Sequence, residues 1–341
     1  MWFAAALICM LGWGCADLFY KKGTDEDDRS SHLKIAVWVG LVMGVCALCL
    51  LPFSETLTEG GFSIRKLAAG AVRYLPASLG YILSMVIGYA GLRYLELSII
   101  SPVQNASGAL SAIVMTLYFI LFTDDKLAAI ADETGLTFTD PTGREAVCNF
   151  LIAAGITIIV AGVIALAVTE QRLSRAETAV GIPENDRKYR FGALALLFPI
   201  LYCLFDTLGT AADGVILDEE TGLGLGEIDV IILYGLTFLL AGAAVWIYMW
   251  IRDRRAYNPF ARSEAPKGIA AVCEESGQVF YVFAMAEKPV LAAPMIASYC
   301  IVSVLLSRIF VGERLRRAQA VCVSLVIAGI VALGVAEGLS F

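Results

Sequence analysis

The chain has 341 residues, of which 59% are hydrophobic and 17% charged, and its formal net charge is −7. A soluble globular domain has roughly half apolar and a quarter charged residues, and a protein that binds nucleic acid usually carries a basic surface. The mean hydropathy of +0.76 therefore excludes an ordinary soluble domain, and the acidic balance argues against a nucleic-acid partner.

The apolar residues are grouped in ten segments, each close to the length of about 20 residues that a helix needs to cross a bilayer. The longer links between them are a charged loop at 21–34, an acidic loop at 123–146 and a polar stretch at 171–190. This pattern predicts an all-α membrane protein with ten transmembrane helices. The segments lie at residues 2–20, 35–53, 72–94, 98–122, 147–169, 191–212, 228–251, 268–287, 289–311 and 318–337.

The positive charges predict which links face the cytoplasm, because Lys and Arg are retained on that side of the membrane. Nineteen of the 25 Lys and Arg residues lie in or beside the links after the first, third, fifth, seventh and ninth segments. We therefore expect a multi-pass protein of the cell (cytoplasmic) membrane with both termini extracytoplasmic. The six residues outside these links are Arg65, Lys66, Arg73, Lys126, Arg144 and Lys288.

The two halves of the chain resemble each other. The sequence VAGVIALAVTE at Val160–Glu170 matches IAGIVALGVAE at Ile327–Glu337, with six identical residues in register. Because each half has an odd number of segments, we expect two inverted five-helix repeats at 1–170 and 191–341, joined by a cytoplasmic linker at 171–190. Many secondary transporters are built in this way. The further matches are Tyr89 with Tyr281 and Pro102 with Pro294, offset by 192 residues, and Asp17 with Asp206, offset by 189.

Nothing in the sequence points to a cofactor or a metal. The nine cysteines lie mostly in apolar segments and are interpreted as small core residues, including Cys46 and Cys49, whose C-x-x-C spacing falls in a predicted membrane helix. The single histidine, His32, lies in a loop, so the chain has no H-E-x-x-H motif and no nucleophile paired with a histidine. We expect no catalytic residue, no metal ligand and no cofactor.

The segment 268–287 carries Glu274 and Glu275 inside an apolar run. A charged side chain within the membrane is disfavoured by roughly 2.5–3.5 kcal/mol, so it should face protein or water. Neighbouring helix residues point about 100° apart, so Glu274 shares a face with Gln278 and Tyr281, whereas Glu275 does not. Glu274 is therefore the preferred functional carboxylate. The pattern leaves open whether it binds a substrate, binds a proton or serves the structure alone.

Two further acidic residues occupy corresponding positions in the halves. Trp13 and Asp17 lie one turn apart in the first segment, and Tyr202 and Asp206 repeat this spacing in the sixth. Asp17 has an alternative interpretation, because it could pair with Lys21 at the membrane interface. Asp206 has no basic neighbour within a turn, which favours a function for it.

The third and fourth segments supply Tyr81 and Asn105 as polar candidates, although Asn105 could equally hold two helices together. Trp13 and Tyr281 could instead face lipid as belt residues. Asp213 lies at a helix end and is interpreted as a solvated cap. The candidate substrate-binding or proton-binding residues are Glu274, Gln278, Tyr281, Asp206, Tyr202, Trp13, Asp17, Asn105, Tyr81 and Glu275.

Three stretches resemble the EamA-like family of the drug/metabolite transporter superfamily. They are Gly12-Trp13-Gly14 followed by Lys21-Lys22, then Ala90 to Ser98 (AGLRYLELS) running into Pro102, and Val311-Gly312-Glu313-Arg314-Leu315 followed by Gln319. The resemblance implies a ten-helix carrier or exporter of small organic solutes with a central cavity between the halves. The chain departs from the family in lacking the Gly-Glu-Arg after its fourth helix, and the charges place its termini outside, whereas relatives often have cytosolic termini.

We therefore expect a secondary active transporter that moves a small organic solute by alternating access, with possible proton coupling. Carboxylates and aromatic rings without a mid-helix Lys or Arg favour a cationic or zwitterionic, amine-like or amino-acid-like substrate. The alternatives are a channel or uncoupled facilitator and, with less support, an intramembrane enzyme using Asp17 and Asp206. The expected partners are this solute and the lipid bilayer, with the protein as a monomer or a homodimer.

Overall fold

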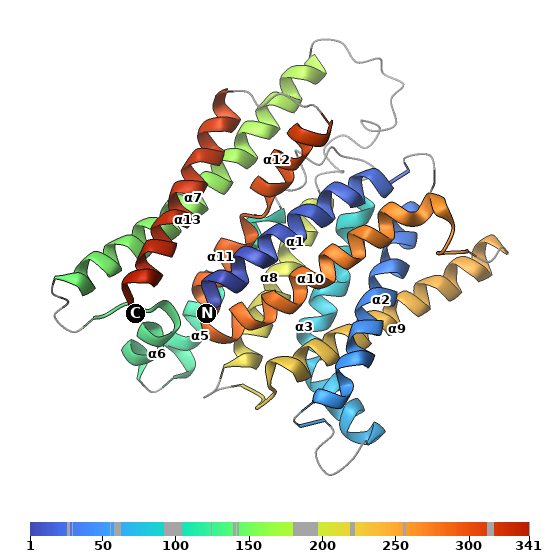
Figure 1. Ribbon diagram of the computed structural model, residues 1–341, viewed down its shortest axis with the longest axis horizontal. Coiled ribbons are helices and arrows are strands. Elements are labelled where there is room, and N and C mark those ends of the chain that lie inside the picture. The colour runs from blue at the N-terminus through green and yellow to red at the C-terminus, as the bar shows by residue number, and fades with distance from the viewer. Residues whose placement is uncertain are drawn as a thin grey trace.

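The computed structural model is a bundle of long helices, and no strand occurs among the residues that it describes (Figure 1). Long apolar runs without water to satisfy the backbone favour helices, because a helix pairs its own N–H and C=O groups. The residues described are 1–25, 28, 30–54, 56–57, 63–91, 104–123, 125–138, 141, 143–179, 197–218, 222–254, 257–311 and 317–340.

The helix boundaries follow the predicted segments, with extensions at the ends. The first half contains α1 (Trp2–Gly23), α2 (Ser31–Leu50), the 3-10 helix η1 (Leu51–Phe53), α3 (Ile64–Gly91), α5 (Ala106–Phe122), α6 (Lys126–Thr134) and α7 (Arg144–Ala179). The second half contains α8 (Leu197–Leu217), α9 (Glu227–Asp253), the 3-10 helix η4 (Arg262–Glu264), α10 (Ala265–Glu287), α11 (Pro289–Ala297), α12 (Cys300–Val311) and α13 (Arg317–Ser340).

Eight helical stretches of the described chain are long and apolar enough to cross a membrane, and α5 is a shorter apolar helix. The prediction of an all-helical, multi-pass membrane protein is therefore confirmed at this level. Helix α10 is not among the eight, although it has 23 residues. Its polar residues, Glu274, Glu275 and Gln278 among them, lower its hydropathy, so its membrane character is not evident from composition.

Four helix pairs make the most extensive contacts: α1 with α10, α2 with α9, α3 with α8, and α7 with α13. Figure 1 shows α7 and α13 side by side at one edge of the bundle. A Cβ atom added to one glycine of each pair would come within about 3 Å of backbone or side-chain atoms of the facing helix. Small residues let helix backbones approach closely in membranes. The facing glycines are Gly12 and Gly277, Gly40 and Gly242, Gly80 and Gly209, and Gly155 and Gly329.

The predicted single helix at 289–311 is interrupted at Ser298 and Tyr299, which separate α11 from α12. Pro294 has no N–H to donate within α11. The turn is tightened by bonds from the Ser298 N–H to the Met295 carbonyl, at 3.1 Å, and from the Tyr299 N–H to the Ile296 carbonyl, at 2.9 Å. The predicted segment is therefore one apolar span, 289–306, with a local break that was not predicted.

The acidic loop predicted at 123–146 contains a short helix, α6, that sequence reasoning missed. The Asp125 side chain accepts a hydrogen bond from the Ala128 N–H at 3.2 Å, and Gly135 ends the helix with a positive φ of 67°. These are common N-cap and C-cap features. The link is therefore partly ordered by local capping.

Candidate functional site

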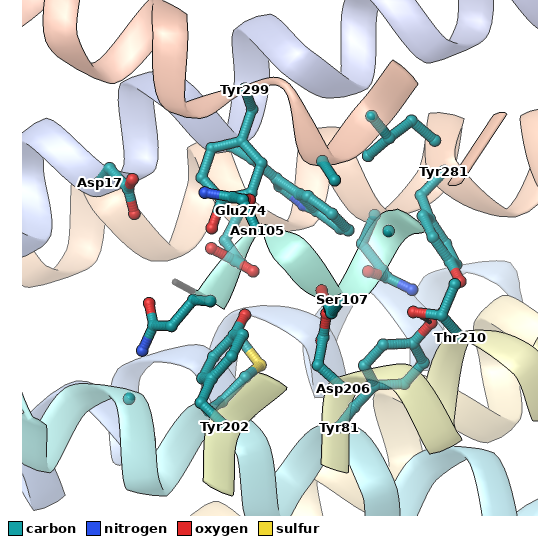
Figure 2. A pocket seen from close by; sticks show the side chains of 18 of the residues that line it. Asp17, Tyr81, Asn105, Ser107, Tyr202, Asp206, Thr210, Glu274, Tyr281 and Tyr299 are labelled. Carbon is teal, nitrogen blue, oxygen red and sulfur yellow. Dashed lines mark hydrogen bonds between the residues drawn. The ribbon is translucent and has the colours of Figure 1, made fainter. Parts of the chain in front are cut away.

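A cavity lies at the centre of the bundle, between α1, α3, α5, α8, α10 and α11, with one residue from α9. Its volume is about 70 Å³, which is enough for a few water molecules. Figure 2 shows how its side chains converge from facing helices. The lining residues are Trp13, Asp17, Tyr20, Tyr81, Met85, Gly88, Tyr89, Gln104, Asn105, Ser107, Gly108, Tyr202, Asp206, Thr210, Tyr234, Glu274, Gln278, Tyr281, Ala293, Ile296, Ala297 and Tyr299.

Charge in the cavity has one sign. Three carboxylates, Asp17, Asp206 and Glu274, contribute to the lining, together with one tryptophan and seven tyrosines. Among the described residues that line it there is no Lys, Arg or His. Nine of the ten predicted site residues belong to this lining, and Glu275 is the one that does not.

Helix α10 separates its two adjacent glutamates. Glu274, Gln278 and Tyr281 all line the cavity, and Figure 2 shows Glu274 and Tyr281 directed toward it. Glu275 lies on another face, is 7% exposed and is placed beside Cys46 of α2. The rotation of about 100° per residue accounts for this separation.

The aspartates of α1 and α8 are held in the same manner. The Ser303 hydroxyl of α12 donates to Asp17 at 2.8 Å, and the Ser107 hydroxyl of α5 donates to Asp206 at 2.6 Å. Each aspartate therefore lies beside the cavity with one hydroxyl donor from a neighbouring helix. Hydrogen bonds to a charged group are typically worth about 1.5–3 kcal/mol, so each serine fixes the orientation of its carboxylate.

Aromatic side chains form the wall at the end of the cavity opposite Asp17, on the right in Figure 2. Trp13 stacks on Tyr281 with ring centroids 5.4 Å apart. The Tyr81 and Tyr281 hydroxyls are hydrogen-bonded to each other, and the Tyr81 hydroxyl also donates to Thr210 at 3.1 Å. The alternative in which Trp13 and Tyr281 face lipid is therefore wrong, since both line the cavity and Tyr281 is buried.

Three N–H donors in the lining have no hydrogen-bond partner within the described chain. They are Trp13 Nε1, Gln104 Nε2 and Gln278 Nε2. A buried polar group without a partner costs about 1–3 kcal/mol. The cavity therefore offers unused donors in addition to its carboxylates.

Sequence reasoning missed several lining residues. Tyr20 and Tyr89 meet at 3.3 Å between their hydroxyl oxygens, and Tyr299 packs edge-on against Trp13 with centroids 5.7 Å apart. Tyr234 of α9 packs against Tyr81. These tyrosines come from segments far apart in the chain whose contacts depend on the fold, so spacing along the chain carries little signal for them. Among the predicted residues, Asn105 is 4% exposed and directly precedes α5.

The interpretation of Asp213 as a solvated helix cap is wrong. Its side chain is fully buried, and Tyr74 of α3 donates a hydrogen bond to Asp213 Oδ1 at 2.8 Å. Asp213 lies within α8, which continues to Leu217, so it does not end the helix. Its position behind the wall of the cavity results from the packing of α3 against α8.

Comparisons with known proteins identify the fold alone. No family model matches the chain, and no curated protein matches it. One solved structure, described only as "Crystal structure of protein", is similar over 97% of this chain and 98% of its own, with a TM-score of 0.55 and 13% sequence identity. At this level of sequence identity, the similarity shows a shared fold and nothing more. The residues that carry the family resemblance at 92–98, Pro102 and 312–315 lie outside the described residues.

Proposed function

We propose that the protein is a secondary active transporter for a small organic zwitterion or cation. The observation that carries this proposal is the central cavity with three carboxylates, eight aromatic side chains and no basic lining residue among those described. Intramembrane ionisable residues are rare and commonly mark the path of a solute or ion. The resemblance to the EamA-like drug/metabolite transporters supports the same function.

The recognition of a positive charge would come from Glu274, Asp206 and Asp17. A substrate ammonium group can pair with a carboxylate, and aromatic faces attract a protonated or quaternary nitrogen by about 0.5–2 kcal/mol. An anionic solute would meet these carboxylates without a compensating lysine or arginine in the described lining. The cavity therefore favours a cationic group over an anionic one.

The unused donors favour a solute that also carries an acceptor oxygen. Trp13, Gln104 and Gln278 each present an N–H group without a partner within the described chain. A carboxylate or hydroxyl on the solute would accept these bonds and remove the cost of leaving them unmade. A compact amino-acid-like zwitterion uses both sets of groups, whereas a simple amine uses only the carboxylates.

Alternating access would follow from two inverted repeats, residues 1–170 and 191–341. If α1, α2, α3, α5 and α7 correspond to α8, α9, α10, the α11–α12 pair and α13, each main contact has a counterpart. When the two halves are exchanged, the contact between α1 and α10 becomes the contact between α8 and α3. In the same way, the contact between α1 and α12 becomes the contact between α8 and α5. The pairs α2–α9 and α7–α13 each combine two corresponding helices, so they remain unchanged by the exchange. This pattern supports an inverted repeat, in which the site lies between the halves.

The interrupted helix also supports a carrier. The break at Ser298 and Tyr299 lies beside the cavity, and α5 begins beside it at Ala106. Discontinuous helices at the membrane centre are frequent around transporter sites. With a volume of about 70 Å³, against roughly 300–1,000 Å³ for typical ligand pockets, the cavity must widen to bind a solute.

We place the protein in the cell membrane with both termini outside.

Counterflow in proteoliposomes tests the proposal. Vesicles loaded with unlabelled glycine betaine or choline are diluted into the labelled compound, and its transient accumulation is followed. We expect exchange that is stimulated by the compound inside and that saturates. An ohmic current without trans-stimulation would show that the protein is a channel and not a carrier. A chemically altered product would show that it is an enzyme.

A further inference from the structure

A second buried carboxylate lies outside the cavity lining. Asp213 follows Thr210 by three residues on α8, so the two lie on neighbouring positions of one face. Thr210 lines the cavity and accepts a hydrogen bond from Tyr81, whereas Asp213 lies deeper and is fully buried. The Tyr81–Tyr281–Thr210 cluster therefore forms a wall, with the solute cavity on one side and Asp213 on the other.

Within the described part of the chain, the recorded partners of Asp213 include no Lys, Arg or His. Tyr74 donates to Oδ1 at 2.8 Å, and Oδ2 has no hydrogen-bond partner within the described residues. The titratable groups that face it are Tyr74 and Tyr81 from α3, Tyr281 from α10 and Tyr234 from α9.

At the adjacent Gly214, α5 and α11 present Met115 and Pro289, neither of which titrates. The described chain has no group of three His, Cys, Asp or Glu residues arranged to hold a metal ion. A divalent cation would need several further oxygen ligands at this position. The smallest partner that neutralises a carboxylate here is a proton.

The tyrosine hydroxyls decide between the two charge states of Asp213. A tyrosine has a single O–H donor. Tyr81 donates to Thr210, so the bond between Tyr81 and Tyr281 uses the O–H of Tyr281. In this arrangement neither hydroxyl is bonded to Oδ2, although both lie close enough to Asp213 to turn toward it. An ionised Asp213 would be a buried charge with one hydrogen bond, from Tyr74, which is unfavourable.

We propose that Asp213 is the proton-binding site that couples the proton gradient to movement of the solute, an inference that rests on the proposed function. A proton from water adds to a lone pair of Oδ2 and forms an O–H bond, and the same bond breaks when the proton returns to water. With the proton bound, Tyr81 and Tyr281 bond to each other and the wall is closed. After release, the carboxylate accepts the O–H of Tyr281, the bond between the two tyrosines breaks, and the wall opens.

The coupling acts in both directions, because two binding events that share one conformational equilibrium influence each other equally. A solute that contacts Tyr281 and separates it from Tyr81 frees a donor for Asp213 and favours loss of the proton. Binding of the proton restores the wall and favours the closed cavity. The wall tyrosines are therefore positioning residues that connect the two sites.

Infrared difference spectroscopy of the purified protein over a pH series tests the proton site without any solute. We expect the C=O stretching band of a protonated carboxylic acid to decrease as the pH rises. Asp213→Asn should remove this component. Asp229→Asn is the matched control, because Asp229 is also buried but accepts hydrogen bonds from Ser54 and Thr56, and it should leave the band unchanged.

Tyr74→Phe provides a second variant that keeps the carboxyl group, and it should shift the frequency of the same band. An unchanged band in Asp213→Asn, or an unshifted band in Tyr74→Phe, would overturn the proposal. In proteoliposomes, Asp213→Asn should lose accumulation of labelled choline driven by a pH gradient, whereas the control Asp229→Asn should keep it. Retained accumulation in Asp213→Asn would contradict the coupling role. Absence of exchange in the unmodified protein would count against the proposed function instead, since the infrared result does not depend on transport.

Discussion

Glu274 and Glu275 are adjacent in sequence and have different surroundings. Glu274 lines the cavity with two other carboxylates, whereas Glu275 is buried against α2 beside Cys46. A rotation of one residue on α10 separates a carboxylate that lines the cavity from one that does not. Intramembrane acidity is therefore a guide to function only together with the face on which it lies.

The largest expected effect is that of Glu274→Gln, which keeps the size of the side chain and removes its charge. Removing one partner of a desolvated charge pair typically costs 2–5 kcal/mol, so choline exchange should fall by about a hundredfold. Initial rates of counterflow, measured at matched protein levels in the vesicles, check this expectation. Exchange at the rate of the unmodified protein would exclude Glu274 from the solute site.

Gly277→Ala tests the close packing of α10, the helix that carries Glu274, against α1. An added Cβ would lie 2.4 Å from Cδ1 of Trp13, so α1 and α10 must separate. Overpacking costs about 1–3 kcal/mol, and thermal unfolding in detergent should show that loss. Gly338→Ala is the control, because its added Cβ meets nothing within 4 Å. Equal stability of the two variants would contradict the close α1–α10 contact.

Asp206→Asn is expected to act less strongly than the Glu274 variant. The charge is lost, but the side chain can still hydrogen-bond with Ser107, and Glu274 and Asp17 remain in the lining. We expect the half-saturation concentration of choline to rise about tenfold, which corresponds to about 1.4 kcal/mol. A concentration series of initial rates measures this change. A half-saturation concentration that does not move would place Asp206 outside the binding surface.

Glu275→Gln should have the smallest effect on transport. Its side chain does not line the cavity, so choline exchange should remain within about twofold of the original. The free energy of unfolding should change by about 1 kcal/mol, the usual contribution of a single hydrogen bond. A loss of exchange as large as that of Glu274→Gln would remove the distinction between the two glutamates.

Helical phase predicted one face of α10 correctly. Glu274, Gln278 and Tyr281 were expected to share a face, and all three line the cavity. Asp17 and Asp206, which were matched between the two halves, also have similar surroundings. Each accepts a hydrogen bond from a serine of a neighbouring helix. These predictions depend only on spacing along the chain, because in a regular helix the spacing between two residues fixes the angle between the directions of their side chains.

Contacts between helices were not predictable in the same way. Asp213 was misread because nothing in its own segment indicates that Tyr74 of α3 reaches it. Tyr20 and Tyr89 meet across α1 and α3, which lie far apart in sequence. The break before Tyr299 was signalled only weakly by Pro294, because proline can also be accommodated in a continuous membrane helix. Such features require the packing of several helices to be known.

The most direct measurement of the central claim compares solutes of one shape and different charge. Thermal unfolding of the purified protein is followed with glycine betaine, choline, 3,3-dimethyl-1-butanol and 3,3-dimethylbutanoate, which are a zwitterion, a cation, a neutral compound and an anion. A ligand at 100 times its dissociation constant stabilises the folded state by about 2.7 kcal/mol. We predict stabilisation by betaine, or by betaine and choline, which is lost in Glu274→Gln and kept in Glu275→Gln. Equal stabilisation by the neutral or anionic compound, or stabilisation that survives in Glu274→Gln, would contradict a cavity that recognises positive charge through Glu274.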